Sequence, residues 1–278
     1  MIEVRPLTGS IGAEIFGIDL SKPLDAATVS RVRKELLSHL VIFLREQSLD
    51  VEQHKNFARQ FGELYIHPYL VTGDDPTVIE IKRRPGDKRV TGDHWHSDTT
   101  IASEPPLGSI LYGIKVPPYG GDTLFANQYL AYESLSETMQ RMLDGLVAIH
   151  SDRQIVTPNI QTAYNQARST TIRQAAEHQE MRNCHPLVRT HPETKRKALY
   201  VNRAQTVGIE GMRDEESQPL LNFLFEHGNR PEFGCRFRWA QGSVAFWDNR
   251  CTKHYAVNDT GPFERHMRRV QICGDKPF

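Results

Sequence analysis

Residues 92–98 read Gly-Asp-His-Trp-His-Ser-Asp and place two candidate metal ligands, His96 and Asp98, two positions apart. We expect this segment to be a β-strand, and a strand points alternate side chains to the same face. Both ligands would then face the same way. A third candidate, His254, lies far downstream. Two ligands on an early strand and one on a late strand are typical of a double-stranded β-helix that is open at one end.

Two imidazoles and one carboxylate on one face of a metal ion leave the opposite face open for substrate and oxygen. This 2-His-1-carboxylate set is the one found in non-haem Fe(II) oxygenases. Arg265 and Arg269 follow His254 along the chain. Because the planar guanidinium of arginine binds a carboxylate through two parallel hydrogen bonds, an arginine here suits a dicarboxylate co-substrate.

The short motif does not decide the ligands by itself. The chain contains 12 histidines, so chance His-x-Asp pairs are common. His94 shares strand parity with His96 and Asp98 and could replace either histidine as a ligand. The residues alone leave this alternative open.

The composition excludes several classes of protein. Lys and Arg together number 34, as do Asp and Glu, so no basic surface for nucleic acid or membrane is indicated. The N-terminus lacks the apolar core of a signal peptide, and no apolar stretch approaches the length of a spanning helix. The four dispersed cysteines are expected to be free thiols. We expect a cytoplasmic homo-oligomer that acts on a small molecule.

The apolar pattern predicts one domain over residues 1–278, rich in strands and without an internal linker. Helices are expected at residues 24–39, 50–62, 131–146 and 214–227. Strands are expected at residues 11–15, 41–44, 77–81, 108–116, 122–126, 197–201, 235–239, 243–248 and 265–272. Many short strands with Gly and Pro turns indicate a mainly β fold, a sandwich or jelly roll with flanking helices.

On the last of these strands, Arg265, Met267 and Arg269 would share one face. An arginine that points into a barrel must find an anion, because an unpaired buried charge is costly. Arg268 would lie on the other face, where we expect a solvated surface charge.

Residues 151–183 do not fit the pattern of short strands. They are rich in Thr, Asn, Gln and Arg, with weak periodicity and few large apolar side chains. A long polar insertion in a compact domain is usually functional or disordered. We therefore expect a mobile lid over the site, with a surface insertion of no function as the alternative.

Several blocks of residues, spread in order over nearly the whole chain, carry a resemblance. They are Phe61-Gly62-Glu63-Leu64, Ile66-His67-Pro68, Trp95-His96-Ser97-Asp98, Gly120-Gly121-Asp122-Thr123, Trp247-Asp248-Asn249-Arg250, His254-Tyr255-Ala256, Arg265-x-Met267-x-Arg269 and Gly274-Asp275-Lys276-Pro277-Phe278. Together they resemble the taurine dioxygenase family of Fe(II)/2-oxoglutarate enzymes.

The resemblance implies a jelly-roll core and a dioxygenase that uses Fe(II), 2-oxoglutarate and dioxygen. It implies that Fe(II) is held by His96, Asp98 and His254. Arg265 would grip the distal carboxylate of 2-oxoglutarate, and Thr123 would donate a hydroxyl hydrogen bond to it. His94 is then a neighbour of the site and not a ligand.

The same resemblance bears on the substrate. Arg269 would lie near the substrate's anionic group or near the C1 carboxylate of 2-oxoglutarate, and His67 matches a histidine that helps to bind the sulfonate in taurine dioxygenase. These residues imply a small anionic substrate, namely an aryloxyalkanoate, an alkyl sulfate ester or a sulfonate. Hydroxylation beside the heteroatom would then break a C–O or C–S bond. The alternative for Arg269 is a structural arginine paired with a local carboxylate.

The chain departs from the taurine enzyme in three places, one of them residues 153–156 of the expected lid, which lack the Ser-Phe pair. The loop at residues 89–94 lacks the Asn-rich sequence, and the run after Asn202 lacks the aromatic residue expected to pack on taurine. Taurine dioxygenase proper is therefore the alternative reading. Residues 90–96 and 209–212 look more like the phenoxypropionate-cleaving branch. An apolar pocket for an aryl or alkyl tail would be formed by Ile155, Val156 and Val207.

Two other classes of protein remain as alternatives. A zinc-dependent hydrolase on a cupin-like barrel could use the same His, Asp and His, but a metal-activated water normally needs a nearby general base. No residue is singled out for that role. A binding protein without iron would keep the barrel and lose the ligands, whereas all three are present.

Overall fold

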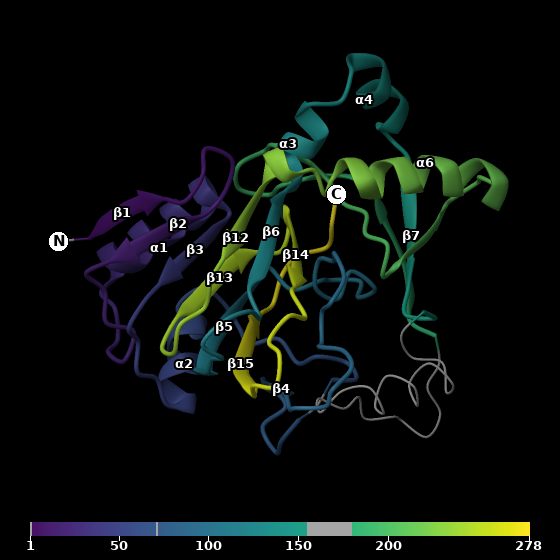
Figure 1. The fold of residues 1–278 in the computed structure, drawn as a ribbon. Helices are drawn as coiled ribbons and strands as arrows, with labels where there is room; N and C mark the ends of the chain where they lie inside the picture. The colour runs from purple at the N-terminus through teal and green to yellow at the C-terminus, as the bar shows by residue number, and fades with distance from the viewer. Residues whose placement is uncertain (1, 71, 155–179) are drawn as a thin grey trace.

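The computed structural model describes residues 2–70, 72–154 and 180–278 of the chain (Figure 1). Within these ranges several β-sheets combine with helices into a mixed α/β architecture. No helix in the described part of the chain is long and apolar enough to cross a membrane.

The largest sheet has seven strands, and most of its neighbouring strands are distant in sequence. Its order is β1 (Glu3–Pro6), β2 (Ala13–Phe16), β3 (Val41–Leu44), β13 (Val244–Asp248), β5 (Gly108–Lys115), β15 (Arg265–Ile272) and β4 (Val78–Arg83). All neighbouring strands pair antiparallel except β2 and β3, which run parallel. The centre of the sheet therefore depends on the two ends of the chain meeting.

A second sheet of three strands packs on one face of the first. Its order is β12 (Gly234–Phe237), β6 (Thr123–Asn127) and β14 (Thr252–Ala256). The shared core contains Phe43 of the large sheet, whose ring stacks on Phe237 with centroids 3.9 Å apart and meets the edge of Phe125 at 5.7 Å. These aromatic contacts hold the two sheets face to face (Figure 1).

Helices α1 (Ala26–His39) and α2 (Val51–Arg59) cover the opposite face of the large sheet. Asp25 caps α1, and Asp50 with Gln53 forms a capping box on α2, as the sequence predicts for α2. Both helices bury apolar side chains against strands β3, β13 and β15. That packing leaves the other face of the sheet for the second sheet.

The prediction that Arg268 is a solvated surface charge is wrong. Arg268 is 5 % exposed because α2 covers its face of β15. Its Nη2 donates to the carbonyl oxygens of Leu49 (2.7 Å) and Asp50 (2.8 Å), and its Nε donates to His54 Nδ1 (3.2 Å). The guanidinium thus joins the sheet to the start of α2.

A third core lies beside the two facing sheets. It packs the sheet of β11 (Thr206–Ile209), β7 (Val147–Ser151) and β8 (Arg182–Pro186) against nearby helices. The remaining elements of this part are α3 (Gln128–Glu133), α4 (Glu137–Leu143), β9 (Val188–Thr190), β10 (Lys197–Leu199), α6 (Asp214–His227) and the 3-10 turn η1 (Pro231–Phe233).

Two predictions change in this region. The single helix expected at residues 131–146 is two helices, α3 and α4, because Ser136 caps a new helix by accepting from Met139 N. Of the expected lid at residues 151–183, Ser151 ends β7 and Arg182 begins β8, while residues 155–179 lie outside the described residues. The bounds of α6 agree with the prediction.

Buried histidines make the stability of this fold dependent on pH. His54 is fully buried, and burial followed by the charge of Arg268 lowers its pKa from 6.5 to about 3. The unfolded chain therefore binds a proton that the folded chain refuses, and stability is lost as pH falls below about 6.5, by up to roughly 1.4 kcal/mol per pH unit for one such histidine.

We predict that the free energy of unfolding in urea decreases from pH 7.5 to pH 5.5. His54→Gln should reduce the slope of this free energy against pH by the contribution of about one bound proton. Glutamine still offers Arg268 an acceptor. His39→Gln, at the half-buried end of α1, serves as the control. An unchanged slope in the His54 variant would show that this histidine titrates equally in both states.

Candidate metal centre

His96 and Asp98 lie between β4 and β5 on a segment that is not a strand, contrary to the prediction. His96 forms an isolated bridge with β14, through His96 N to His254 O (3.0 Å) and His254 N to His96 O (2.8 Å). The chain turns on both sides of this bridge, at Gly92 (φ +83°) and Thr99 (φ +50°). The turns break the alternation on which the parity argument rested, and the bridge to β14 brings the three side chains together instead.

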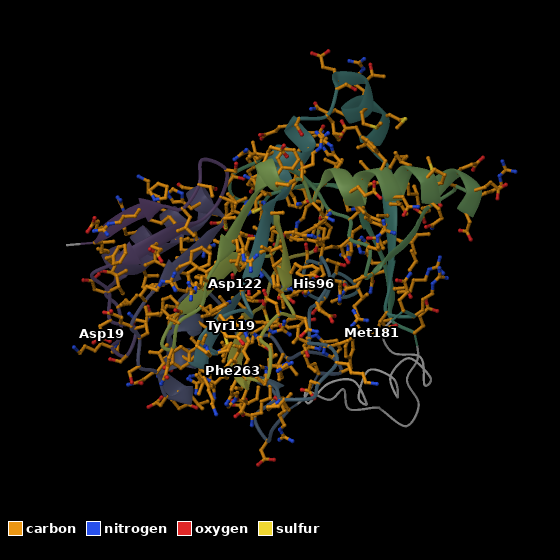
Figure 2. All side chains as sticks on the ribbon, viewed as in Figure 1. Asp19, His96, Tyr119, Asp122, Met181 and Phe263 are labelled. Atoms are coloured by element: carbon orange, nitrogen blue, oxygen red, sulfur yellow. The ribbon has the colours of Figure 1, made fainter. Side chains whose placement is uncertain are left out.

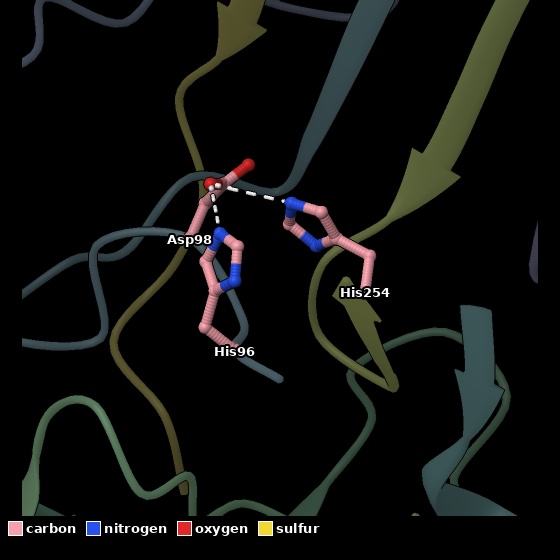
Figure 3. A group of neighbouring side chains, drawn as sticks. All are labelled: His96, Asp98 and His254. Atoms are coloured by element: carbon pink, nitrogen blue, oxygen red, sulfur yellow. Dashed lines mark ion pairs between the residues drawn. The ribbon is translucent and has the colours of Figure 1, made fainter. Parts of the chain in front are cut away.

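The three predicted ligands meet in one buried group (Figure 3). Asp98 Oδ1 lies 3.7 Å from His96 Nε2 and 3.8 Å from His254 Nε2. The three ligand atoms all lie within 4.8 Å of one another. Two imidazole nitrogens and one carboxylate oxygen at this spacing fit a divalent transition metal.

His94 is not a member of this group in the described structure. Its backbone carbonyl accepts a hydrogen bond from His96 Nδ1 at 2.8 Å. That bond fixes the proton of His96 on Nδ1 and leaves the lone pair of Nε2 directed at the group, which is how ligating histidines are commonly oriented. His94 therefore contributes through its backbone.

The electrostatics of the group favour the protonation states of metal ligands. Burial lowers the pKa of His254 to about 4 and holds the pKa of His96 well below its usual value. Burial opposes ionisation of Asp98. The positive charge of Arg269, with smaller contributions from the two histidines, nevertheless holds the pKa of that carboxyl below its usual range. At neutral pH the group is two neutral imidazoles and one carboxylate.

Asp98 is held at every polar atom. Ser109 Oγ donates to Oδ2 at 2.6 Å, and Arg269 Nη1 donates to Oδ1 at 2.9 Å. Asn249 accepts from Asp98 N (2.6 Å) and donates to Asp98 O (2.9 Å). From the sequence Asn249 could be named only as part of a matching block, and Ser109 was not predicted. No motif in the sequence pairs Ser109 with Asp98, because their contact depends on the register of β5 in the sheet.

A small cavity of about 40 Å³ opens beside the group. It is lined by His96, His254, Thr123, Arg265 and Arg269, together with Ile81, Thr91, Gly92, Leu111, Trp247 and Ala256. Three predicted functional positions outside the metal group, Thr123, Arg265 and Arg269, thus share one cavity with it.

Arg265 is a buried cation in this cavity with unused donors. It is 6 % exposed, and its Nε and Nη2 have no hydrogen-bond partner among the described residues. Burial lowers the pKa of Arg265 to about 10, so the side chain is still charged at neutral pH. Thr123 Oγ1 accepts from Trp239 Nε1 at 2.9 Å, which leaves its own proton free to donate. These donors fit a carboxylate.

The loops before β6 and β15 are tied together around Arg265. Tyr119 and Phe263 meet edge to face at 5.3 Å (Figure 2), and Asp259 Oδ1 accepts from Gly121 N at 2.7 Å. Gly121 has φ +69°, and a Cβ there would lie 2.9 Å from Arg265 Cδ, so a larger residue would displace the arginine. These contacts therefore hold Thr123 and Arg265 in a fixed position relative to each other.

The remaining predicted substrate residues, His67 and Val207, do not line this cavity. His67 is buried, and burial followed by the charge of Arg269 lowers its pKa to about 3. Its Nδ1 accepts from the backbone N–H of Leu70 at 3.1 Å, so the neutral ring carries its proton on Nε2. Val207 lies buried at a register shift in β11.

A second group with metal-ligand chemistry consists of His191, Asp248 and Cys251. Its ligand atoms are already engaged. Arg250 Nε and Nη2 donate to the two oxygens of Asp248 at 2.9 and 2.6 Å, and His191 Nε2 donates to Oδ2 at 3.0 Å. Burial raises the pKa of the Cys251 thiol well above its usual value. This group reads as a buried structural ion pair.

Comparison with known proteins places the whole chain among oxygenases. The family model described as taurine catabolism dioxygenase TauD, TfdA family matches residues 3–271. An alkylsulfatase of Acinetobacter baylyi is 38% identical over 284 residues, covering 99% of this chain and 86% of the relative. An alpha-ketoglutarate-dependent sulfate ester dioxygenase of Pseudomonas putida is 37% identical over 281 residues, covering 99% and 91%.

A solved structure agrees with the sequence comparisons. The crystal structure described as a putative alpha-ketoglutarate-dependent taurine dioxygenase from Burkholderia xenovorans is 41% identical, with a TM-score of 0.84. The match covers 100% of this chain and 94% of that chain. The sheets described above are thus arranged as in that protein.

We predict that His96→Ala, Asp98→Asn and His254→Ala each remove stoichiometric Mn(II) binding, measured by calorimetric titration without oxygen. Each change removes one of the three predicted ligands, and Asn keeps the shape of Asp98 while removing its charge. His94→Ala is the matched control and should bind Mn(II) as the unchanged protein does. Loss of binding in the His94 variant with retention in the His96 variant would reverse the assignment of the histidine.

Proposed function

This chain belongs to the taurine catabolism dioxygenase TauD, TfdA family and is a 2-oxoglutarate (alpha-ketoglutarate)-dependent dioxygenase, and from this premise we propose that it hydroxylates a small alkyl sulfate ester. The observation that carries the proposal is a pair of buried arginines, Arg265 and Arg269, in one cavity with the metal group. Its likeness over nearly its whole length to an alkylsulfatase and a sulfate ester dioxygenase supports the choice among anions.

We infer that the two facing sheets form a double-stranded β-helix within one domain over residues 1–278. The metal group lies where the segment before β5 bridges to His254 in the middle of β14. This is the position in which a jelly roll presents ligands from distant parts of the chain. The shared aromatic core supports the inference.

In the proposed site His96, Asp98 and His254 hold Fe(II). The neutral imidazoles and the ionised carboxylate described above suit this ion. When bound, Fe(II) with 2-oxoglutarate and dioxygen would supply the oxidant for hydroxylating a C–H bond. The chain's own contribution is to position these groups and to limit water around them.

Arg265 and Thr123 would bind the distal carboxylate of 2-oxoglutarate. The guanidinium has unpartnered Nε and Nη2 atoms in a buried place, and the threonine hydroxyl has a proton to give. A dicarboxylate completes both sets of hydrogen bonds and neutralises the buried charge of Arg265. Succinate, the other product expected with carbon dioxide, is bound by the same pair.

Arg269 and His67 would recognise the sulfate group of the substrate. Arg269 Nη1 is engaged with Asp98, but its Nε has no partner among the described residues. His67 is neutral and carries a donor on Nε2. Hydroxylation of the carbon that bears the sulfate oxygen gives an unstable hydroxy sulfate, which splits into an aldehyde and sulfate.

The substrate class is tested by succinate formed in response to each candidate. Hexyl sulfate should give succinate, hexanal and sulfate in equal amounts, whereas taurine and a phenoxypropionate should give little succinate. Equal stimulation by taurine would return the chain to the alternative of taurine dioxygenase proper. Turnover of hexyl sulfate without 2-oxoglutarate would instead support the alternative of a zinc-dependent hydrolase.

We predict that Arg265→Ala raises the KM for 2-oxoglutarate by roughly 10- to 100-fold, because a charge-assisted hydrogen bond to an anion contributes about 1.5–3 kcal/mol. Thr123→Val should raise it less. Arg238→Ala, an exposed arginine after β12, is the control. An unchanged KM for 2-oxoglutarate in the Arg265 variant would contradict the assignment.

Arg269→Leu should weaken the binding of hexyl sulfate much more than the binding of 2-oxoglutarate, because it leaves the sulfate anion without its buried partner. The comparison is hexyl sulfate against neutral hexyl methanesulfonate, measured as kcat/KM in both proteins. The unchanged protein should prefer the sulfate, and the variant should lose that preference. Equal turnover of the two esters by the unchanged protein would defeat anion recognition. Mn(II) titration of the variant separates this effect from disturbance of Asp98.

A further inference from the structure

The two carboxylate oxygens of Asp98 have different environments. Oδ1 faces both histidine Nε2 atoms, at 3.7 and 3.8 Å, whereas Oδ2 accepts a 2.6 Å hydrogen bond from Ser109 Oγ. Ser109 is fully buried on β5. The serine therefore divides the carboxylate into one oxygen turned to the metal group and one oxygen turned to the sheet.

The direction of the serine hydroxyl is fixed by a second residue. Gln271 Nε2 donates to Ser109 Oγ at 2.9 Å, and Gln271 is 1 % exposed. A hydroxyl has one proton, so a serine that accepts from Gln271 is left to donate that proton to Asp98. Ser109 and Gln271 are direct register partners on the antiparallel strands β5 and β15. The register of the sheet thus places Gln271, Ser109 and Asp98 in one chain of hydrogen bonds.

Other contacts of Asp98 do not divide the carboxylate in this way. Asn249 fixes the backbone N–H and carbonyl of Asp98 and touches neither carboxylate oxygen. Arg269 donates to Oδ1, the oxygen that already faces the histidines. Among the described residues the hydrogen bond to Oδ2 comes from Ser109. Without it, rotation of the side chain would turn both oxygens toward the metal.

We propose that Ser109 and Gln271 are positioning residues that make Asp98 ligate the metal through Oδ1 alone. A carboxylate can bind a metal through one oxygen or through two, and the second oxygen would occupy a position that 2-oxoglutarate or dioxygen needs. Hydrogen bonds to ligating carboxylates commonly set such choices. This inference rests on the proposed metal site, and neither residue belongs to the blocks that carry the family resemblance.

Co(II) provides a direct readout, because the intensity of its visible absorption falls as its coordination number rises. The variants are Ser109→Ala, which removes the donor to Oδ2, and Gln271→Met, which keeps the bulk of the glutamine and releases the serine hydroxyl. Ser243→Ala is the matched control, since Ser243 is fully buried immediately before β13 and its hydroxyl accepts from Arg45 and does not contact Asp98. The melting temperature of each variant is recorded.

In Ser109→Ala the absorption per bound Co(II) should fall, and the affinity of the Co(II) protein for 2-oxoglutarate should drop by roughly 10- to 100-fold, as is typical for the loss of such a partner. Gln271→Met should shift both quantities in the same direction by less. Ser109→Thr, which restores a hydroxyl, should return the spectrum. Ser243→Ala should leave both quantities unchanged.

A folded Ser109→Ala protein with the original spectrum and the original affinity for 2-oxoglutarate would overturn the proposal. So would changes of equal size in Ser109→Ala and Ser243→Ala, which would mark a general loss of packing. Failure of the unchanged protein to bind Co(II) would instead overturn the proposed metal site from which the inference starts.

Discussion

The buried charge of Asp98 is the constraint on which the rest of the site depends. A carboxylate that is 3 % exposed stays ionised only where hydrogen bonds and opposite charges replace water. Arg269 supplies the charge and Ser109 supplies a hydrogen bond, from the neighbouring strands β15 and β5. The order of the central strands therefore positions the partners of the Asp98 carboxylate as well as the aromatic core.

Strand β15 carries buried arginines on both of its faces. Arg265 and Arg269 point into the cavity, whereas Arg268 between them points to α2 and joins the helix to the sheet. Two cations in the cavity with unpartnered nitrogens predispose the site to anions, so in the proposed function one face of one strand would bind both the co-substrate and the substrate. The buried arginine on the other face does not line the cavity and bonds the backbone at the start of α2.

The sequence identifies the site better than it identifies the local structure around it. His96, Asp98 and His254 could be named because metal ligands are restricted to few residue types, and the blocks around them match a family. The expected strand at residues 92–98 failed because turns at Gly92 and Thr99 depend on the bridge to β14. Ser109 and Gln271 could not be named, since their roles arise from register between strands distant in sequence. Arg268 was misplaced because parity says which face a residue takes and not what covers it.

Anomalous diffraction from crystals grown with Mn(II) would locate the ion independently of activity. We expect one strong peak within bonding distance of His96 Nε2, Asp98 Oδ1 and His254 Nε2, with Asp98 Oδ2 still bonded to Ser109. A peak at the group of His191, Asp248 and Cys251, or a metal bound by both oxygens of Asp98, would contradict it.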